Sequence, residues 1–282
     1  MKYVVVLGDG MADRPIAELG DQTPLAYAET PTMDQLAAVS EIGMVHTIPD
    51  GMKPGSDTAN LSVLGYNPRI YYSGRSPLEA LSIGVDMKDT DIALRCNLVT
   101  LSEEEENYED RTIIDHSSGE ISTADAAVLL DAVREGLENE TYKFYVGTSY
   151  RHLLIWDRGE VVELTQPHDV LGQTIGQYLP EDAVLREMMK KSYDILVNHP
   201  INVERKKKGL NPANSCWFWG AGTKPALSSF EEKTHLKGAM ISAVDLLKGI
   251  AVGASMKVIE VEGANGGLNT NYEGKHRQRL TY

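Results

Sequence analysis

Two short stretches near the amino terminus combine residue types that could handle a phosphate group. Asp9 lies between two glycines directly after the apolar run 3–7, and Ser56 opens a second stretch that continues with Asp57 and Thr58. Five consecutive apolar residues, three of them valine, predict a strand buried on both faces, as in a parallel sheet. Ser56 is predicted to begin a helix, where unpaired N–H groups and the helix dipole favour a phosphate.

A carboxylate and a serine hydroxyl at one sheet edge would suit metal-assisted phosphoryl transfer. Asp9 at the carboxyl end of a strand is placed to bind a hard cation, and such a cation could deprotonate Ser56 for attack on a phosphate ester. Two simpler interpretations stay open, because Ser56 or Asp57 could be an ordinary N-cap and Asp9 could only shape a Gly-Asp-Gly turn. The hypothesis depends on both side chains meeting at one edge.

Further motifs continue this pattern over nearly the whole chain. They are Gly8-Asp9-Gly10-Met11-Ala12-Asp13, Pro54-Gly55-Ser56-Asp57-Thr58-Ala59-Asn60, Leu64-Gly65-Tyr66, Tyr150-Arg151-His152, Pro212-Ala213-Asn214, Trp217-Phe218-Trp219-Gly220 and Thr270-Asn271-Tyr272-Glu273-Gly274-Lys275. In order and spacing the chain resembles the archaeal-type cofactor-independent phosphoglycerate mutases of the alkaline phosphatase superfamily. The resemblance implies interconversion of 2-phosphoglycerate and 3-phosphoglycerate through a phosphoserine at Ser56, without a requirement for 2,3-bisphosphoglycerate.

The length of 282 residues favours two domains, because one compact core rarely grows so large. The resemblance implies an α/β fold with an alkaline-phosphatase-like parallel-sheet core. We expect residues 1–85 and 256–282 to form that core, and residues 86–255 to form an inserted, substrate-orienting α/β domain. The expected helices include residues 30–39, 122–137, 181–196 and 235–248, and the expected strands include residues 43–47, 91–101 and 257–261.

Several polar residues of the expected insert are candidates for binding glycerate. Arg95 and Asn97 are two residues apart on an alternating strand, so they project from the same face, although solvation of an edge strand would explain them equally. Arg151 could clamp a carboxylate or phosphate, and His152 could hydrogen-bond a hydroxyl or carry a proton; otherwise both are surface residues. The resemblance adds Asp115, which ends a second strand.

The remaining candidates are basic. Arg205 falls in a family-like Asn-x-x-Arg pattern, and the run Lys206–Lys208 is either a solvated loop or an anion site. Arg75, just before a helix start, could approach an anion or be an exposed structural residue. The resemblance places Lys275 opposite the phosphoserine, where its ammonium group would neutralise the transferred phosphoryl group; an exposed helix lysine is the alternative.

The metal ligands are incomplete. The superfamily binds two metal ions, using Asp9 and Ser56 in this numbering together with later Asp and His residues, but after Asp245 the sequence contains no Asp and only His276. We therefore expect a truncated chain that holds Mn2+, Mg2+ or Zn2+ weakly if at all, and whose activity is in doubt.

The charge composition limits the classes of molecule that the protein is expected to bind. With 41 acidic and 27 basic residues the net charge is -14, which opposes nucleic acid and anionic membranes, so a small phosphorylated substrate would need a local basic pocket. Cys96 and Cys216 have no metal-ligand spacing, and no apolar run approaches the ~18 residues of a membrane span or forms a signal peptide, which favours a cytoplasmic protein. The oligomeric state is not predicted. A homoserine kinase-like phosphotransferase, although the chain lacks a Walker loop, and a non-catalytic phosphoglycerate-binding module are the alternatives.

Overall fold

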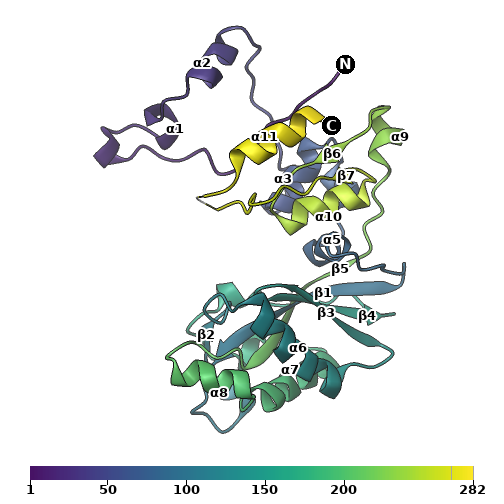
Figure 1. Ribbon diagram of the computed structural model, residues 1–282. Helices are drawn as coiled ribbons and strands as arrows, with labels where there is room; N and C mark the ends of the chain where they lie inside the picture. The colour runs from purple at the N-terminus through teal and green to yellow at the C-terminus, as the bar shows by residue number, and fades with distance from the viewer. Residues whose placement is uncertain (268, 282) are drawn as a thin grey trace. The chain divides into compact units, whose positions relative to one another are not determined.

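The computed structural model describes residues 1–267 and 269–281; the elements before residue 91 are helical, and strands mixed with helices follow (Figure 1). The chain divides into two units, Met1–His46 and Thr47–Tyr282, and each is described separately below. The mixture of helices with sheets confirms the predicted α/β class.

The first unit contains short helical segments. They are η1 (Ala17–Leu19), α1 (Pro24–Tyr27) and α2 (Pro31–Ala38). The last of these confirms the helix predicted over residues 30–39, with Pro31 in the first turn, where its missing N–H costs nothing. Thr30 precedes it, and its hydroxyl donates a hydrogen bond to the Asp34 carboxylate at 3.0 Å.

The strands predicted over residues 3–7 and 43–47 are absent from the described residues, and that prediction was wrong for this structure. Val5 and Val6 are 77% and 79% exposed. A continuous apolar run becomes a central strand only when neighbouring strands bond its backbone and other elements cover both its faces. The described residues of the first unit supply no such neighbours.

The second unit is organised around β1 (Asp91–Leu101), which confirms the strand predicted over those residues. This strand lies between β4 (Arg151–Asp157) and β5 (Ser215–Thr223), both antiparallel to it. The sheet is completed by β3 (Tyr142–Thr148) beside β4 and by β2 (Ile113–Asp115) at the carboxyl end of β1. The register places Asn97 opposite both Arg151 and Trp217.

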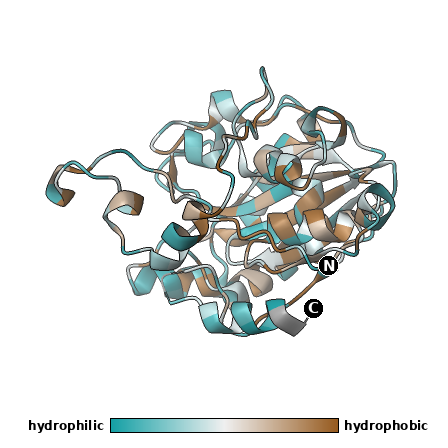
Figure 2. Cartoon of the chain, turned by 90° about the horizontal axis from the view of Figure 1, so that it is seen from above, coloured by the Kyte–Doolittle hydropathy of each residue, from teal (hydrophilic) through white to brown (hydrophobic). Residues whose placement is uncertain are grey.

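One face of this sheet is covered by α6 (Thr123–Leu137) and α7 (Ala183–Leu196) (Figure 1). The even-numbered residues of β1 point into the core beneath these helices: Ile92, Leu94, Cys96 and Leu98. Hydrophobic segments, brown in Figure 2, gather in the sheet and in the helices that cover it. The Ser122 hydroxyl accepts the Asp125 N–H at 3.1 Å, which confirms the predicted start of α6, whereas α7 begins at Ala183, two residues later than predicted, with Asp182 as its cap.

The opposite face carries α5 (Arg75–Ser82). Its Ala80 packs with Ala93 and Ile155 of the sheet, whereas its Leu78 packs against α10 (Asp245–Gly253). Gly249 makes the helix contact possible, because a Cβ atom there would lie 1.7 Å from the Leu78 carbonyl oxygen. Two further helices, α3 (Ser56–Val63) and α4 (Pro68–Tyr71), belong to the same region, and α3 packs on α10.

The segment after β5 differs from its prediction. The helix expected over residues 235–248 is replaced by α9 (Phe230–Thr234), β6 (Ala239–Met240) and α10. In the described ranges β6 makes the only parallel pairing, with β7 (Lys257–Val258), which lies inside the strand predicted over 257–261. The last described helix is α11 (Tyr272–Thr281). The domain limits predicted near residues 86 and 255 stay a prediction.

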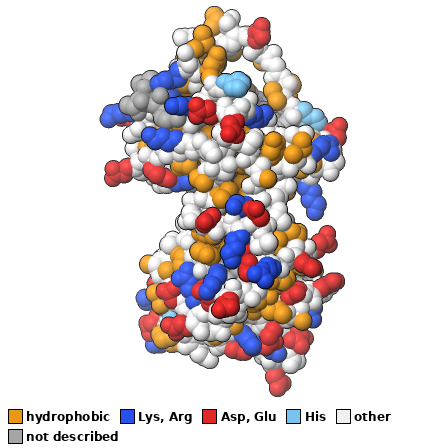
Figure 3. Space-filling model, turned by 90° about the vertical axis from the view of Figure 1, so that its right-hand side faces the viewer, with side chains coloured by type: hydrophobic (Ala, Val, Ile, Leu, Met, Phe, Trp, Pro, Cys, Tyr) orange, Lys and Arg blue, Asp and Glu red, His pale blue; other side chains and the backbone are white. Residues whose placement is uncertain are grey.

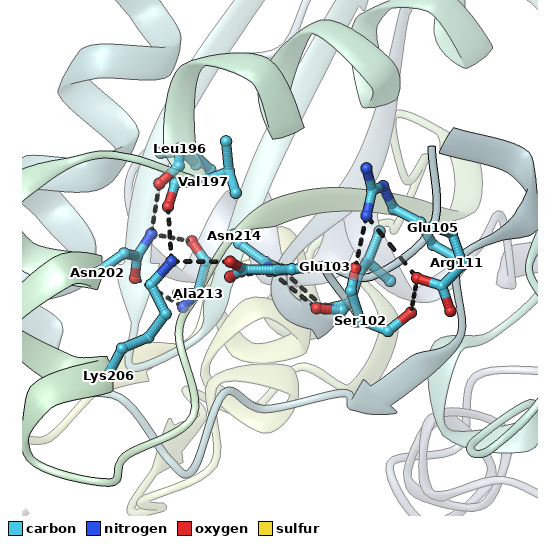
Figure 4. Close-up of polar contacts among 11 residues, drawn as sticks. Ser102, Glu103, Glu105, Arg111, Leu196, Val197, Asn202, Lys206, Ala213 and Asn214 are labelled. Carbon is cyan, nitrogen blue, oxygen red and sulfur yellow. Dashed lines mark hydrogen bonds and ion pairs between the residues drawn. The ribbon is translucent and has the colours of Figure 1, made fainter. Parts of the chain in front are cut away.

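The acidic run after β1 is held by a network of polar contacts (Figure 4). Glu103 accepts hydrogen bonds from Lys206 of α8 (Pro200–Lys207) at 2.8 Å and from Asn214 at 3.2 Å, and Arg111 donates to the Ser102 carbonyl at 2.9 Å. Lys207 is likewise paired with Glu204. Two of the three lysines of the basic run are therefore engaged by carboxylates. The remaining short turns are η2 (Tyr108–Asp110), η3 (Pro167–Asp169) and η4 (Gly176–Tyr178).

In the described ranges every helix is too short or too polar to cross a bilayer.

Candidate functional site

Ser56 is the first residue of α3, and it is exposed. Its cap is Gly55 in extended conformation, so neither Ser56 nor Asp57 is the N-cap residue. The neighbouring Asp57 is buried, where its carboxylate accepts the Thr58 N–H at 2.8 Å and the Tyr72 hydroxyl at 2.9 Å. The hydroxyl of Ser56 is thus accessible at a helix start, while Asp57 is occupied by its own neighbours.

Asp9 belongs to the first unit, in a turn in which Gly10 has a φ of +74°. Ser56 belongs to the second unit, so the predicted meeting of the two side chains stays a prediction. Among the described residues no three His, Cys, Asp or Glu side chains gather in a group that could hold a metal ion. The described side chains therefore do not fit the two-metal centre that the sequence resemblance implies, and no step below is routed through a metal.

Arg95 and Asn97 project from the same face of β1, as the alternation predicted, since both contact Trp219, and Arg95 also reaches Glu79 of α5. The Arg95 guanidinium lies 3.1 Å from the Glu79 carboxylate and 4.5 Å above the Trp219 ring. The Asn97 carbonyl accepts the Trp219 indole N–H at 3.1 Å, and its amide donates to the His116 carbonyl at 3.2 Å. Asn97 is 1% exposed and both ends of its amide are engaged, so its side chain fixes Trp219 and the loop that carries His116.

Arg151 begins β4 directly beside Asn97, and its guanidinium lies 5.3 Å from the centre of the Tyr150 ring. It is half-buried, and its Nε has no hydrogen-bond acceptor among the described residues. A guanidinium in this state has donors left for an anionic ligand.

His152 is 1% exposed, so it contacts no solvent. Its Nδ1 accepts the Gly147 N–H at 3.2 Å, and its Nε2 is buried without a partner among the described residues. Burial, and then the positive charge of Arg134, lower the pKa of His152 to about 4. The imidazole is therefore neutral at pH 7 and suits a hydrogen-bonding role better than proton uptake. A small pocket beside it is also lined by Glu79, Arg151 and Asp245.

Asp115 and Arg205 hold the loop that follows β2. The Asp115 carboxylate accepts hydrogen bonds from the Ser117 N–H and hydroxyl, from the Gly119 N–H and from the Asn211 amide. Burial alone would raise the pKa of Asp115, but these donors outweigh it and lower the pKa. Arg205 donates to the carbonyls of Ser118 and Asn211 at 2.6 and 2.9 Å. The hydrogen bonds of both side chains therefore stabilise the loop after β2.

That loop brings rings together that the sequence analysis had not grouped. His116 lies 5.7 Å from Tyr150 and 6.0 Å from His168, and His168 lies 5.5 Å from Trp219, each with its ring steeply inclined to its neighbour. The rings thereby connect Arg95, stacked on Trp219, with Arg151, stacked on Tyr150.

Arg75 was named as a possible anion contact, but its partner Glu79 was not predicted. Their spacing of four residues on a predicted helix was a signal for a pair on one helix face, and the Arg75 Nε does lie 3.0 Å from the Glu79 carboxylate. No local pattern in the sequence could indicate that Glu79 would also reach Arg95 on a strand.

Lys275 lies on α11, half-buried, with its backbone N–H bonded to the Asn271 carbonyl at 3.3 Å. Within the described part of the chain no hydrogen bond or ion pair joins its side chain to α3. Its predicted place opposite the phosphoserine stays a prediction.

The site is locally positive in an acidic chain. Burial lowers the pKa of Arg95; Glu79 opposes this shift, whereas Arg75 and Arg151 add to it. Glu79 contacts the guanidinium groups of Arg75 and Arg95, and its carboxylate lines one pocket together with Arg151 and Asp245. On the face drawn in Figure 3, Lys and Arg side chains gather with Asp and Glu around them. Arg75, Arg95 and Arg151 give the site the local positive charge that an anionic ligand requires.

A protein-family model described as 2,3-bisphosphoglycerate-independent phosphoglycerate mutase matches residues 37–202. A relative of that name from Methanosarcina barkeri is 51% identical over 280 residues, which are 98% of this chain and 69% of the relative. A relative from Geobacter sulfurreducens, named a probable enzyme of the same kind, is 48% identical over 98% of this chain and 69% of its own length.

Two solved structures are similar to this chain. The PH0037 protein from Pyrococcus horikoshii has a TM-score of 0.74 and 32% sequence identity, over 96% of this chain and 64% of that one. The cofactor-independent phosphoglycerate mutase from Thermoplasma acidophilum has a TM-score of 0.55 and 30% identity, over 96% of this chain and 71% of that one. The chain thus spans slightly less than two thirds of the Pyrococcus protein.

Proposed function

Because this chain belongs to the family of 2,3-bisphosphoglycerate-independent phosphoglycerate mutases, we propose that it interconverts 2-phosphoglycerate and 3-phosphoglycerate through a phosphoserine at Ser56. The phosphorylated substrate is a small anion, and the sheet of the second unit would bind its glycerate part.

The reaction needs two transfers. In the first, the Ser56 Oγ attacks phosphorus, the bond from phosphorus to the C2 oxygen breaks, and the serine proton ends on that oxygen. Glycerate then turns, its C3 hydroxyl attacks the phosphoserine, the bond from phosphorus to Oγ breaks, and the proton returns to Ser56. Water must be excluded between the two transfers, because hydrolysis of the phosphoserine would otherwise compete.

The observation that carries the proposal is the pair of arginines on one face of the sheet. Arg95 and Arg151 come from neighbouring strands, and Glu79 is the carboxylate that contacts Arg95. A guanidinium recognises a carboxylate or a phosphate through two parallel hydrogen bonds, so two of them could hold glycerate while it turns.

We assign the other predicted residues of this site to positioning. Asn97 accepts a hydrogen bond from Trp219, and both Asp115 and Arg205 form hydrogen bonds that hold the loop after β2. The buried His152 accepts a hydrogen bond from the turn that precedes Arg151. At α3, the helix start would receive the phosphoryl group, and Lys275 would neutralise its charge.

Several finer features belong to this proposal. They are an alkaline-phosphatase-like core from residues 1–85 and 256–282, the insert 86–255, and a divalent metal, Mn2+, Mg2+ or Zn2+, held through Asp9 and Ser56. A metal would lower the pKa of the serine hydroxyl, but the described residues bring no third ligand to such a site. The buried free cysteines Cys96 and Cys216 support a cytoplasmic location. Neither homoserine phosphorylation nor a purely binding role is favoured by a particular observation.

The test compares Ser56→Ala with Ser62→Ala, a control on the same helix, in a coupled assay of 3-phosphoglycerate conversion. Mass spectrometry of the protein after incubation with 3-phosphoglycerate supplies a second readout, the phosphoseryl adduct. We expect turnover and the adduct in the wild type and in Ser62→Ala, and neither in Ser56→Ala. Turnover by Ser56→Ala would refute the role of Ser56, and a wild-type chain without turnover or adduct would refute the activity of this chain.

A further inference from the structure

Arg75 is an arginine whose purpose the reaction above does not explain. It is the first residue of α5, its side chain is 40% exposed, and its Nε lies 3.0 Å from Oε1 of Glu79. The two terminal nitrogens of the guanidinium have no hydrogen-bond acceptor among the described residues. These donors are oriented by the ion pair and are available to a ligand.

Glu79 holds a second guanidinium through the same oxygen atom. Its Oε1 lies 3.1 Å from a terminal nitrogen of Arg95. Because both contacts share one oxygen, the bonded nitrogens of Arg75 and Arg95 are no more than about 6 Å apart. A carboxylate or phosphate has oxygens about 2.2 to 2.5 Å apart and can accept from guanidinium groups on two sides.

The two arginines differ in access. The Arg95 side chain is 5% exposed and lies against the Trp219 ring, so its positive charge is held in one position inside the protein. Arg75 stands at the exposed end of the same group and is close enough to Arg95 to lower the pKa of that residue, as Arg151 is. Three guanidinium groups with the carboxylates of Glu79 and Asp245 beside them leave a surplus of one positive charge, which favours an anionic ligand.

We propose that Arg75 is a third anion-binding guanidinium of the site, held in its orientation by Glu79 and acting beside Arg95 and Arg151. This inference rests on the proposed function, since it assigns Arg75 to the same phosphorylated substrate. Glu79 is then a positioning residue, because it touches the arginines and not the substrate.

The experiment measures binding of 3-phosphoglycerate by calorimetry on the full chain. The variants are Arg75→Gln, Arg75→Lys and a control, Arg158→Gln, which removes an 83% exposed arginine near Asp157 at the far end of β4. We expect Arg75→Gln to raise the Kd about tenfold, as loss of charged hydrogen bonds would, with a smaller effect for Arg75→Lys, which keeps the charge. Arg158→Gln should leave the Kd within about twofold.

Thermal unfolding of the same variants separates a structural role from a binding role. In the absence of ligand, Arg75→Gln and Arg158→Gln should unfold at the same temperature. When 3-phosphoglycerate is added, the unfolding temperature of Arg75→Gln should rise less than that of Arg158→Gln. Wild-type binding that Arg75→Gln leaves unchanged would overturn the inference alone. Failure of the wild type to bind 3-phosphoglycerate would overturn the proposed site and this inference with it.

Discussion

Replacing Glu79 with glutamine removes the charge that balances Arg95, the most buried arginine in the described part of the chain. The Arg95 side chain is 5% exposed and that of Glu79 is 14% exposed, with 3.1 Å between the charged atoms. Breaking such a pair from one side typically costs about 3 to 5 kcal/mol, because the remaining charge stays buried and uncompensated. The stacking of Arg95 on Trp219, worth about 1 to 2 kcal/mol, is retained, and glutamine keeps one acceptor oxygen.

We therefore expect Glu79→Gln to lower the free energy of unfolding by about 3 kcal/mol, at the lower end of that range. Urea unfolding followed by tryptophan fluorescence is a direct assay, since Trp219 contacts Arg95. The matched control is Glu187→Gln. It breaks an exposed ion pair with Lys191, which has the i,i+4 spacing that Glu79 has with Arg75, and it should lower the free energy of unfolding by less than about 0.5 kcal/mol.

A second variant tests the cause of the loss. Changing Arg95 to methionine in the Glu79→Gln background removes the unpaired charge, so the double variant should be more stable than Glu79→Gln alone. A loss below about 1 kcal/mol for Glu79→Gln would refute the reasoning. So would a double variant whose loss equals the summed losses of the two single changes.

Two other predictions concern the interior. His152 has a folded-state pKa of about 4 against an ordinary 6.5, so protonation favours the unfolded chain, and stability should fall as the pH falls from about 6.5 to about 4, by up to about 3 kcal/mol. Urea unfolding over this pH range should show that the free energy of unfolding of His152→Gln depends less on pH than that of the wild type. An NMR titration of His152 centred near pH 6.5 would contradict the prediction. Gly249→Ala should cost about 2 kcal/mol, because its methyl group would collide with the Leu78 carbonyl of α5. In the same unfolding assay Val252→Ala, on the exposed side of α10, is the control, and equal losses for both variants would argue against the close approach of the helices.

Local sequence signals predicted the elements whose partners lie nearby or whose pattern is strict. The alternation of β1 fixed both its bounds and the shared face of Arg95 and Asn97. Ser122 marked the start of α6, since its side chain bonds an N–H group within its own first turn, whereas the start of α7 was predicted two residues too early, at Glu181. Such signals are contained in a few residues and do not depend on the rest of the fold.

The errors arose where distant contacts decide the structure. The apolar run 3–7 carries no information about which strands would flank it, and in the described residues none does. The helix predicted over residues 235–248 stops just before Gly249, yet Gly249 lies inside α10, where the backbone of α5 approaches it closely. Gly is placed there by helix packing, which a reading of local propensity cannot detect.

In the site, too, local sequence patterns predicted some residues, while residues that depend on distant contacts were missed. Sequence spacing proposed Arg95, Asn97, Arg151 and His152, which the sheet register brings onto neighbouring positions of β1 and β4. It missed Glu79 and Trp219, whose contacts with Arg95 join a helix, a central strand and a strand more than a hundred residues later.

The double packing of α5 links two parts of the molecule through one short helix. Leu78 belongs to the contact with α10, Ala80 belongs to the contact with the sheet, and Glu79 lies between them in the chain. A rotation of α5 away from α10 would withdraw the Glu79 carboxylate from both guanidinium groups at once. If the proposed site is correct, ligand affinity at the sheet should therefore respond to a substitution at Gly249, which lies on a different helix.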